Sequence, residues 1–153
     1  MTRFAILSAL ALAVSACAGA EADPKTTSSP SSTTPPPAAQ EQCESYFTRL
    51  RTCTDQYIPA LVDLRIELDQ PAGIAQSAQT DGRDAIIARA MEEWATDSQP
   101  AAITATCGEL LGSIPPAQLE TMRADAERCM AMTDCGEFAT CANELQRARI
   151  QGQ

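Results

Sequence analysis

Six cysteines constrain the fold of this chain more than any other feature. Seven cysteines occur among 153 residues, and all but one lie beyond residue 42. The six are Cys43, Cys53, Cys107, Cys129, Cys135 and Cys141. In an exported chain an even set of this kind is typical of disulfides, so we expect three bridges. Each would stabilise the fold by about 2–4 kcal/mol, which matters for a core with few aromatic side chains.

The N-terminus indicates export. Arg3 and the α-amine give a positive start, and residues 4–14 (FAILSALALAV) form an apolar segment. A membrane-spanning helix needs about 20 such residues, so this segment is too short to span a bilayer. We therefore predict a signal peptide over residues 1–16. Export places the rest of the chain in an oxidising compartment, where disulfides persist.

The end of this segment, Val14-Ser15-Ala16-Cys17, resembles the lipobox of bacterial lipoproteins. The resemblance implies that Cys17 begins the mature protein, carries diacylglycerol on sulfur and an acyl chain such as palmitate on its amine, and anchors it to a membrane. Two or three acyl chains give stable anchoring. By the same resemblance, Ala18 after the lipidated cysteine implies that the protein is sorted to the cell outer membrane.

Cleavage behind Ala20 is the alternative. It would release a soluble periplasmic or secreted protein, and both routes leave the same six cysteines.

Residues 17–41 are expected to form the lipidated N-terminus and a linker. The stretch TTSSPSSTTPPPAAQ is dominated by proline, serine and threonine and shows no apolar periodicity. Such a segment cannot bury enough surface to offset its ordering entropy. We predict a disordered tether that leads into a cysteine-rich domain over residues 42–150.

The periodicity of residues 42–150 predicts an all-α fold, a small disulfide-stapled bundle of about four to five helices. The first helix should begin near Glu41, and Pro59 should kink or break it. Later helices should start after Thr80-Asp81, at Pro100 and at Pro115-Pro116, and Asp134 should cap the last. The expected apolar stripes are Tyr46, Phe47, Leu50 and Cys53; Ile87, Met91 and Trp94; Ile103, Cys107 and Leu110; Leu119, Met122, Ala126 and Cys129; and Phe138, Cys141, Leu145 and Ala148.

The pattern of residues 62–69 is compatible with both a strand and a helix. Residues 62–69 (VDLRIELD) alternate strictly, which is typical of a strand, whereas Leu61, Leu64 and Leu68 fit a helical face. A lone strand cannot satisfy its backbone, and we find no partner strand, so we interpret the stretch as helix. Residues 70–80 are expected to form a loop.

Helix geometry restricts the cysteine pairing. Cys43 and Cys53 lie about 15 Å apart along one helix, and Cys135 and Cys141 about 9 Å apart along another. Both separations exceed what a disulfide spans, so the bridges should join different helices.

Two resemblances to known proteins give further expectations for the cysteines and the domain. Cys43 and Cys53 resemble the first half of a twin C-x₉-C hairpin, which implies a bridge from Cys43 to Cys141, although the C-terminal spacing departs from that pattern. The domain as a whole is similar to uncharacterised cysteine-rich helical lipoproteins of Gram-negative bacteria, several of which end in DC-x-x-F-x-x-C. That similarity implies no particular activity.

The sequence lacks the residues that several kinds of catalytic, cofactor and metal sites require. The chain has no histidine, so histidine-dependent nucleophiles and covalent haem attachment are excluded. Zinc sites and redox dithiols favour closely spaced cysteine pairs that the sequence lacks. We expect no cofactor and no metal; Asp63, Glu67 and Asp69 could gather calcium but fit a solvated helix face better. The formal net charge is −9, with one lysine and no basic patch, which argues against nucleic acid.

The function expected from the sequence is therefore non-catalytic. We predict a lipid-anchored helical module that contacts the membrane through its lipid and binds a protein or other envelope component. A small inhibitor or immunity-type module is one alternative. A hydrolase that uses paired carboxylates is another.

Overall fold

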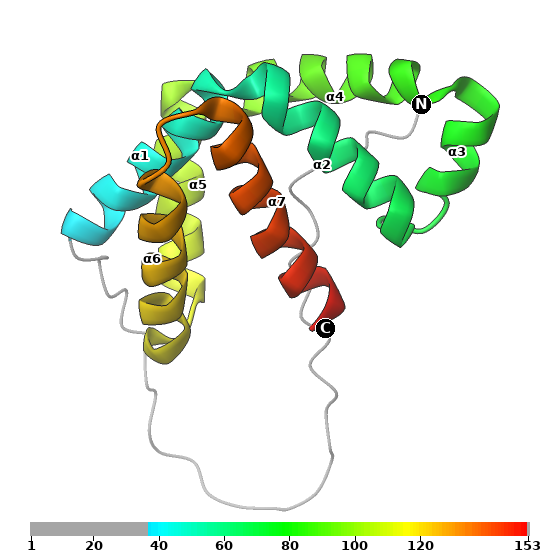
Figure 1. The fold of residues 1–153 in the computed structure, drawn as a ribbon. Coiled ribbons are helices and arrows are strands. Elements are labelled where there is room, and N and C mark those ends of the chain that lie inside the picture. Colours follow the sequence, from blue (N-terminus) through cyan, green and yellow to red (C-terminus); the bar gives the residue numbers. More distant parts are fainter. Residues whose placement is uncertain (1–36, 153) are drawn as a thin grey trace, which may run out of the picture. The chain divides into compact units, whose positions relative to one another are not determined.

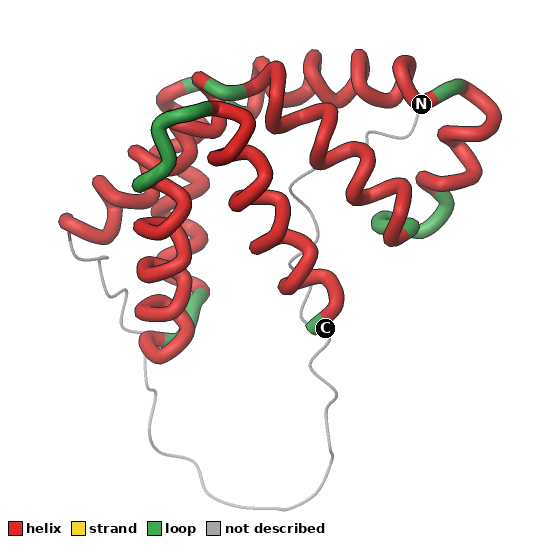
Figure 2. Tube along the Cα trace, viewed as in Figure 1, coloured by secondary structure: helices red, strands yellow, loops and turns green. Residues whose placement is uncertain are grey.

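Seven α-helices make up the part of the chain that the structure describes, residues 37–152 of a computed structural model (Figure 1). They are α1 (Pro37–Thr52), α2 (Thr54–Leu68), α3 (Ile74–Asp81), α4 (Arg83–Asp97), α5 (Pro100–Ser113), α6 (Pro116–Met130) and α7 (Cys135–Gln151). No strand occurs within this range (Figure 2), which confirms the all-α prediction. The helix count exceeds the expected four to five. The predicted signal peptide, Cys17 and the linker up to residue 36 lie outside the described residues.

Helix α2 forms the centre of the fold. It packs against α7 on one side and α4 on the other, while α1 packs against α5 and α6. Its buried side chains include Ile58, Leu61 and Val62, and α7 brings the small buried residues Ala139 and Ala142. Small residues allow two helices to approach closely, so burial of this face explains why residues 62–68 are helical despite their strand-like alternation.

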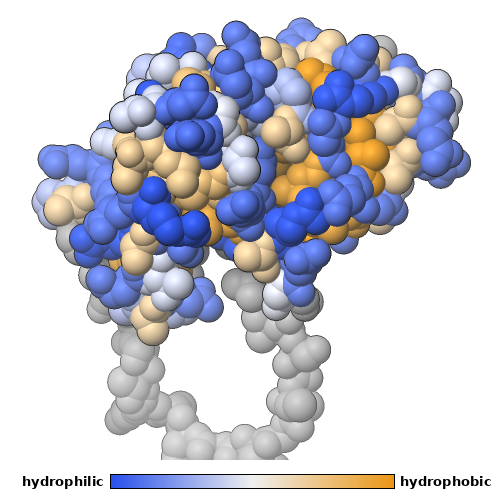
Figure 3. Space-filling view, viewed as in Figure 1, coloured by the Kyte–Doolittle hydropathy of each residue, from blue (hydrophilic) through white to orange (hydrophobic). Residues whose placement is uncertain are grey.

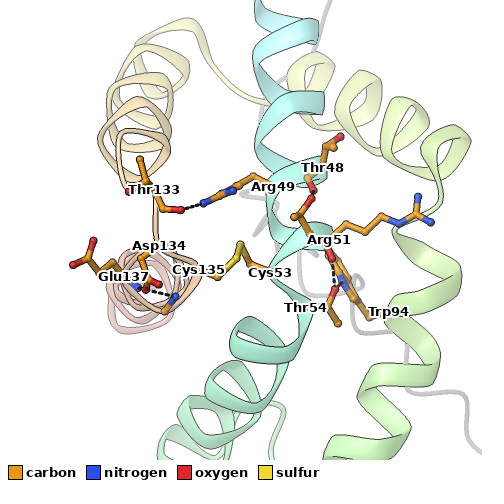
Figure 4. The surroundings of a disulfide bond; sticks show 12 residues. Thr48, Arg49, Arg51, Cys53, Thr54, Trp94, Thr133, Asp134, Cys135 and Glu137 are labelled. Atoms are coloured by element: carbon orange, nitrogen blue, oxygen red, sulfur yellow. Dashed lines mark hydrogen bonds between the residues drawn. A yellow bond between two sulfur atoms is a disulfide. The ribbon is translucent and has the colours of Figure 1, made fainter.

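The first helix is interrupted at Cys53 and not at Pro59. The expectation that Pro59 kinks or breaks this helix is therefore wrong. Pro59 stands inside α2, whereas Cys53 leaves helical geometry with φ −99° and ψ 23°. The hydroxyl of Thr54 stabilises this corner. It donates to the Arg51 carbonyl at 2.6 Å and accepts from the indole nitrogen of Trp94 at 3.0 Å (Figure 4). Burial of the residues around Pro59 outweighs the missing backbone donor.

The interpretation of residues 70–80 as a loop is also wrong, because α3 occupies most of that stretch. None of its residues is buried, and Ile74 is the only large apolar residue among its eight, so the sequence offers little sign of a core-facing helix. Its start is satisfied locally: one carboxylate oxygen of Asp69 accepts from the backbone nitrogens of Gly73 at 2.9 Å and Ala75 at 3.1 Å. Gly73 has φ 91°, a conformation that glycine adopts without strain.

The other helix starts test the remaining expectations. Helix α1 begins at Pro37, four residues before Glu41, and α4 begins at Arg83, after Gly82. Asp81 ends α3 and does not cap α4, which corrects the expectation for Thr80-Asp81. Helices α5 and α6 begin at prolines, as predicted. A proline at the first helical position needs no amide partner and already has a helical φ, so its signal is strong.

Asp134 caps α7 as predicted, and its replacement should have a measurable cost. Its carboxylate accepts from the backbone nitrogens of Gly136 at 2.8 Å and Glu137 at 3.0 Å. Asp134→Ala should lower the free energy of unfolding by about 1 kcal/mol, because two amide groups lose their acceptor. Asp134→Asn keeps an acceptor and serves as the control in urea unfolding. An equal loss for both variants would contradict the capping role.

Candidate functional site

Three disulfides join the six downstream cysteines. They connect Cys43 with Cys107, Cys53 with Cys135, and Cys129 with Cys141, with Cα–Cα separations of 5.8, 5.2 and 5.5 Å. All three run between different helices or their ends, as helix geometry predicted. The Cys43–Cys141 bridge implied by the hairpin resemblance is wrong, because α5 and not α7 lies beside the first half of α1. Disulfides persist in oxidising compartments, so this set indicates an exported chain.

The bridges hold together four helices, α1, α5, α6 and α7, which we call the disulfide frame. Figure 4 shows how the frame is closed at the end of α1, where Cys53 meets Cys135 at the start of α7. Beside this bridge, Arg49 donates to the carbonyl of Thr133 and its guanidinium lies 5.6 Å from the centre of the Phe138 ring. These contacts fix the α6–α7 connection against α1.

Away from that closed end, apolar side chains of the frame stay incompletely covered. Leu119, Met122 and Ala126 share the predicted stripe of α6 with Cys129, yet only Cys129 is buried and the other three are half-buried. Leu145 on α7 is half-buried as well. The Cys129–Cys141 bridge ties α6 to α7 near their connection, and the two helices diverge from there (Figure 1). The stripes therefore face a gap that no described side chain fills.

This gap is a cavity of about 100 Å³. Its walls are mostly apolar and come from all four frame helices, with Tyr57 of α2 at one side. The charged lining residues are Arg123 of α6 and Arg149 of α7. Figure 3 shows apolar side chains at the surface between α6 and α7, with strongly hydrophilic ones beside them. A half-enclosed apolar cavity with a few polar groups is the usual form of a small binding site.

Hydrogen bonds order the polar rim on the α6 side. Arg123 donates from Nε to the side-chain oxygen of Gln42 at 2.9 Å, and Gln42 donates to Glu127 at 2.9 Å. Arg123 also pairs with Glu120 at 3.3 Å. On the α7 side, Arg149 forms no ion pair with any described residue, and it is exposed. The two arginines are therefore unequal, because among the described residues only Arg123 is held by an ion pair and side-chain hydrogen bonds.

Both tyrosines of the chain line the cavity, and both hydroxyls are held neutral. Burial raises the pKa of Tyr57 well above its usual range, and the neighbouring Tyr46 raises it further. Burial also raises the pKa of Tyr46, with Arg149 opposing the shift and Asp125 adding to it. The ring of Tyr46 lies edge-on to Phe138, with centroids 5.6 Å apart. Both phenols therefore act as apolar wall with a neutral hydroxyl.

The carboxylates considered for calcium each have other partners. Asp63 forms two hydrogen bonds with Arg83 of α4, at 2.6 and 2.8 Å. Glu67 forms two with Arg147 of α7, both at 2.6 Å. These arginines lower the pKa of Asp63 and of Glu67. Asp69 caps α3. Within residues 37–152 no group of three potential metal ligands gathers.

No family model matches this chain, and no curated protein or solved structure matches it significantly. Within the described range, every helix is too short or too polar to cross a membrane. The candidate site therefore stands on its own geometry. Sequence reasoning placed Leu119, Met122, Ala126 and Leu145 in the core and missed the cavity. An apolar stripe shows which face turns inward and does not show whether a neighbouring helix covers it.

Alkaline titration should report the burial of the two tyrosines. In the folded chain, tyrosinate absorbance should appear only above the usual pKa of about 10, whereas in denaturant both should titrate near 10. Because the folded state holds these protons more tightly, stability is complete below pH ~10 and falls as pH rises above it. Tyr57→Phe should reduce that fall. Normal titration of both tyrosines in the folded chain would contradict their burial.

Proposed function

We propose that this chain is an exported, lipid-anchored and non-catalytic binding module that holds an envelope protein through the cavity of the disulfide frame. The observation that carries the proposal is the cavity itself. Four apolar residues predicted as core remain half-buried around it, at the divergent ends of α6 and α7. A half-enclosed apolar cavity with a few polar groups at its rim is the usual form of a binding site in a small domain.

The disulfide frame supports a binding role because it limits the adjustment of the cavity walls. Each of the four frame helices carries at least one half-cystine: α1 carries Cys43, α5 Cys107, α6 Cys129, and α7 both Cys135 and Cys141. A site held open in advance binds at a lower entropic cost than one that must be ordered.

The anchor is proposed on the lipobox resemblance of residues 14–17. The mass of the mature N-terminus tests it directly. We expect an acylated, diacylglyceryl-modified Cys17 in the outer membrane fraction. An unmodified chain that begins at Glu21 would show that the protein is cut behind Ala20 and released.

The binding role is tested by photo-crosslinking in intact cells. A photoreactive side chain at Leu119, on the cavity wall, should yield discrete crosslinked species. The matched control is Ala88, an exposed residue of α4 outside the cavity lining. The same diffuse pattern from both positions would argue against the cavity as the binding surface.

A further inference from the structure

We propose that the cavity takes the C-terminal residue of a partner polypeptide. Its large apolar side chain would fill the cavity, and its α-carboxylate would lie against Arg149. This inference rests on the proposed binding function and deepens it, because it names the chemistry that the cavity recognises.

The size of the cavity limits its occupant to one side chain. A cavity of ~150 Å³ with aliphatic walls accommodates a benzene ring. The cavity here is smaller, about 100 Å³, and opens to solvent, so a side chain of the size of leucine or isoleucine fits it, and a phenylalanine ring would extend into the opening. A long acyl chain has several times that volume and would leave most of its length in water. The dimension therefore favours a peptide side chain over a membrane lipid.

The charge around the cavity favours a carboxylate on one side only. On α6, Glu120 already pairs with Arg123, and Glu127 accepts from Gln42. Asp125 on the same helix is close enough to Tyr46 to raise the pKa of its hydroxyl. These carboxylates disfavour a further anion at the α6 side. On α7, Arg149 lines the cavity without an ion pair among the described residues and can receive an anion.

A C-terminal residue combines the two requirements on a single Cα. Its side chain and its carboxylate are joined through one carbon, so the side chain can enter the cavity while the carboxylate reaches a guanidinium at the rim. An arginine also binds a carboxylate through two parallel hydrogen bonds, which adds orientation to charge. Capture of a terminal carboxylate is a known mode of peptide recognition.

The test uses the full exported chain with Cys17→Ser, so that no acyl chain of its own competes. The probes are acetyl-Gly-Ser-Gly-Leu and acetyl-Gly-Ser-Gly-Phe as free acids, the same peptides as C-terminal amides, an alanine-ended peptide, and octanoate. Binding at millimolar concentration is followed by NMR of the Leu119, Met122 and Leu145 methyl groups. We expect these methyls to shift with the leucine- or phenylalanine-ended acids, and the amides to bind about tenfold more weakly.

Two variants assign the contacts. Arg149→Gln should weaken the free acid about tenfold and leave the amide unchanged, because only the acid presents a charge to the guanidinium. Arg89→Gln, on α4 and outside the cavity lining, is the matched control and should change neither. Met122→Trp should fill the cavity and abolish binding of both forms, with unfolding in urea confirming that the variant folds.

Three results would overturn the inference: no methyl shift with any peptide, equal affinity for acid and amide, or tighter binding of octanoate than of every peptide. The last would identify a small alkyl carboxylate as the occupant. If crosslinking at position 119 succeeds while the peptides fail, the binding module stands and the C-terminal inference is wrong.

Discussion

Replacement of both Cys53 and Cys135 with alanine is expected to lower the free energy of unfolding by about 4 kcal/mol. This bridge closes the longest loop of the three, with a sequence separation of 82 residues. A long loop gains the most freedom in the unfolded chain when its crosslink is removed. The change also frees the corner between α1 and α2 from the start of α7.

The matched control is the pair Cys129→Ala and Cys141→Ala. That bridge separates its cysteines by only 12 residues, so its loss should cost about 3 kcal/mol by the same chain-entropy argument. Urea unfolding of the three oxidised chains provides the comparison. A larger loss for Cys129–Cys141 than for Cys53–Cys135 would show that local packing, and not loop length, determines the contribution of each bridge.

Phe138→Ala is expected to lower the free energy of unfolding by about 3–5 kcal/mol, which is the range for a fully buried phenylalanine. Phe138 is 0% exposed, and its ring lies 5.6 Å from both the Tyr46 centroid and the Arg49 guanidinium carbon. Truncation would leave a hole where α7 meets α1, beside the Cys53–Cys135 bridge. The cation–π contact of Arg49 would be lost as well.

Two further variants show which part of the stability loss in Phe138→Ala comes from the lost side-chain volume. Phe138→Leu retains most of the volume and should cost about 1.5 kcal/mol or less. Met130→Ala removes an exposed apolar side chain, 37% accessible, and should change stability by only about 0.5 kcal/mol. Urea unfolding measures all three. If Phe138→Ala costs no more than Met130→Ala, the described packing around Phe138 is incorrect.

Helix starts with a local chemical signal were predictable from the sequence. Pro100, Pro116 and Asp134 mark helix starts through their own backbone or side-chain chemistry, and no other part of the fold is needed to interpret them. Helix α3 lacks such a signal in its own residues. Its start is stabilised by Asp69, which lies before it, and none of its side chains is buried.

Which side of a helix is buried is harder to predict from the sequence than whether the helix forms. In α4 the sequence favours Ile87, Met91 and Trp94, whereas the structure buries Ile86, Ala90 and Trp94. Both triplets fit the helical period and share Trp94, so periodicity does not distinguish them. The position of α2 distinguishes the two triplets. The Trp94 indole donates a hydrogen bond to the Thr54 hydroxyl, and its ring centroid lies 5.9 Å from that of Tyr57. The expectation that Trp94 belongs to the core is confirmed.

The cysteine pairing and the cavity depend on how the helices pack, which local patterns do not encode. Helix geometry excluded two pairings within helices and left the rest open. The cavity arises where α6 and α7 diverge, although each carries an apolar stripe that ordinary packing would cover. In both cases the missing information is the angle between helices, which is set by all the contacts of the frame together.

The order of the cysteines along the chain has a consequence for biogenesis. No native bridge joins two cysteines that are consecutive in the sequence: each pair skips at least one other cysteine. During translocation from the N-terminus, Cys43 and Cys53 meet the oxidant first, while their partners Cys107 and Cys135 are still far behind. Oxidation in order of emergence would yield no native bond. Early formation of α1 protects against this, because the helix separates Cys43 from Cys53, which directly follows its last residue, by about 15 Å. Any non-native bridge between cysteines that emerge together must be reshuffled by thiol–disulfide exchange before the native set can form.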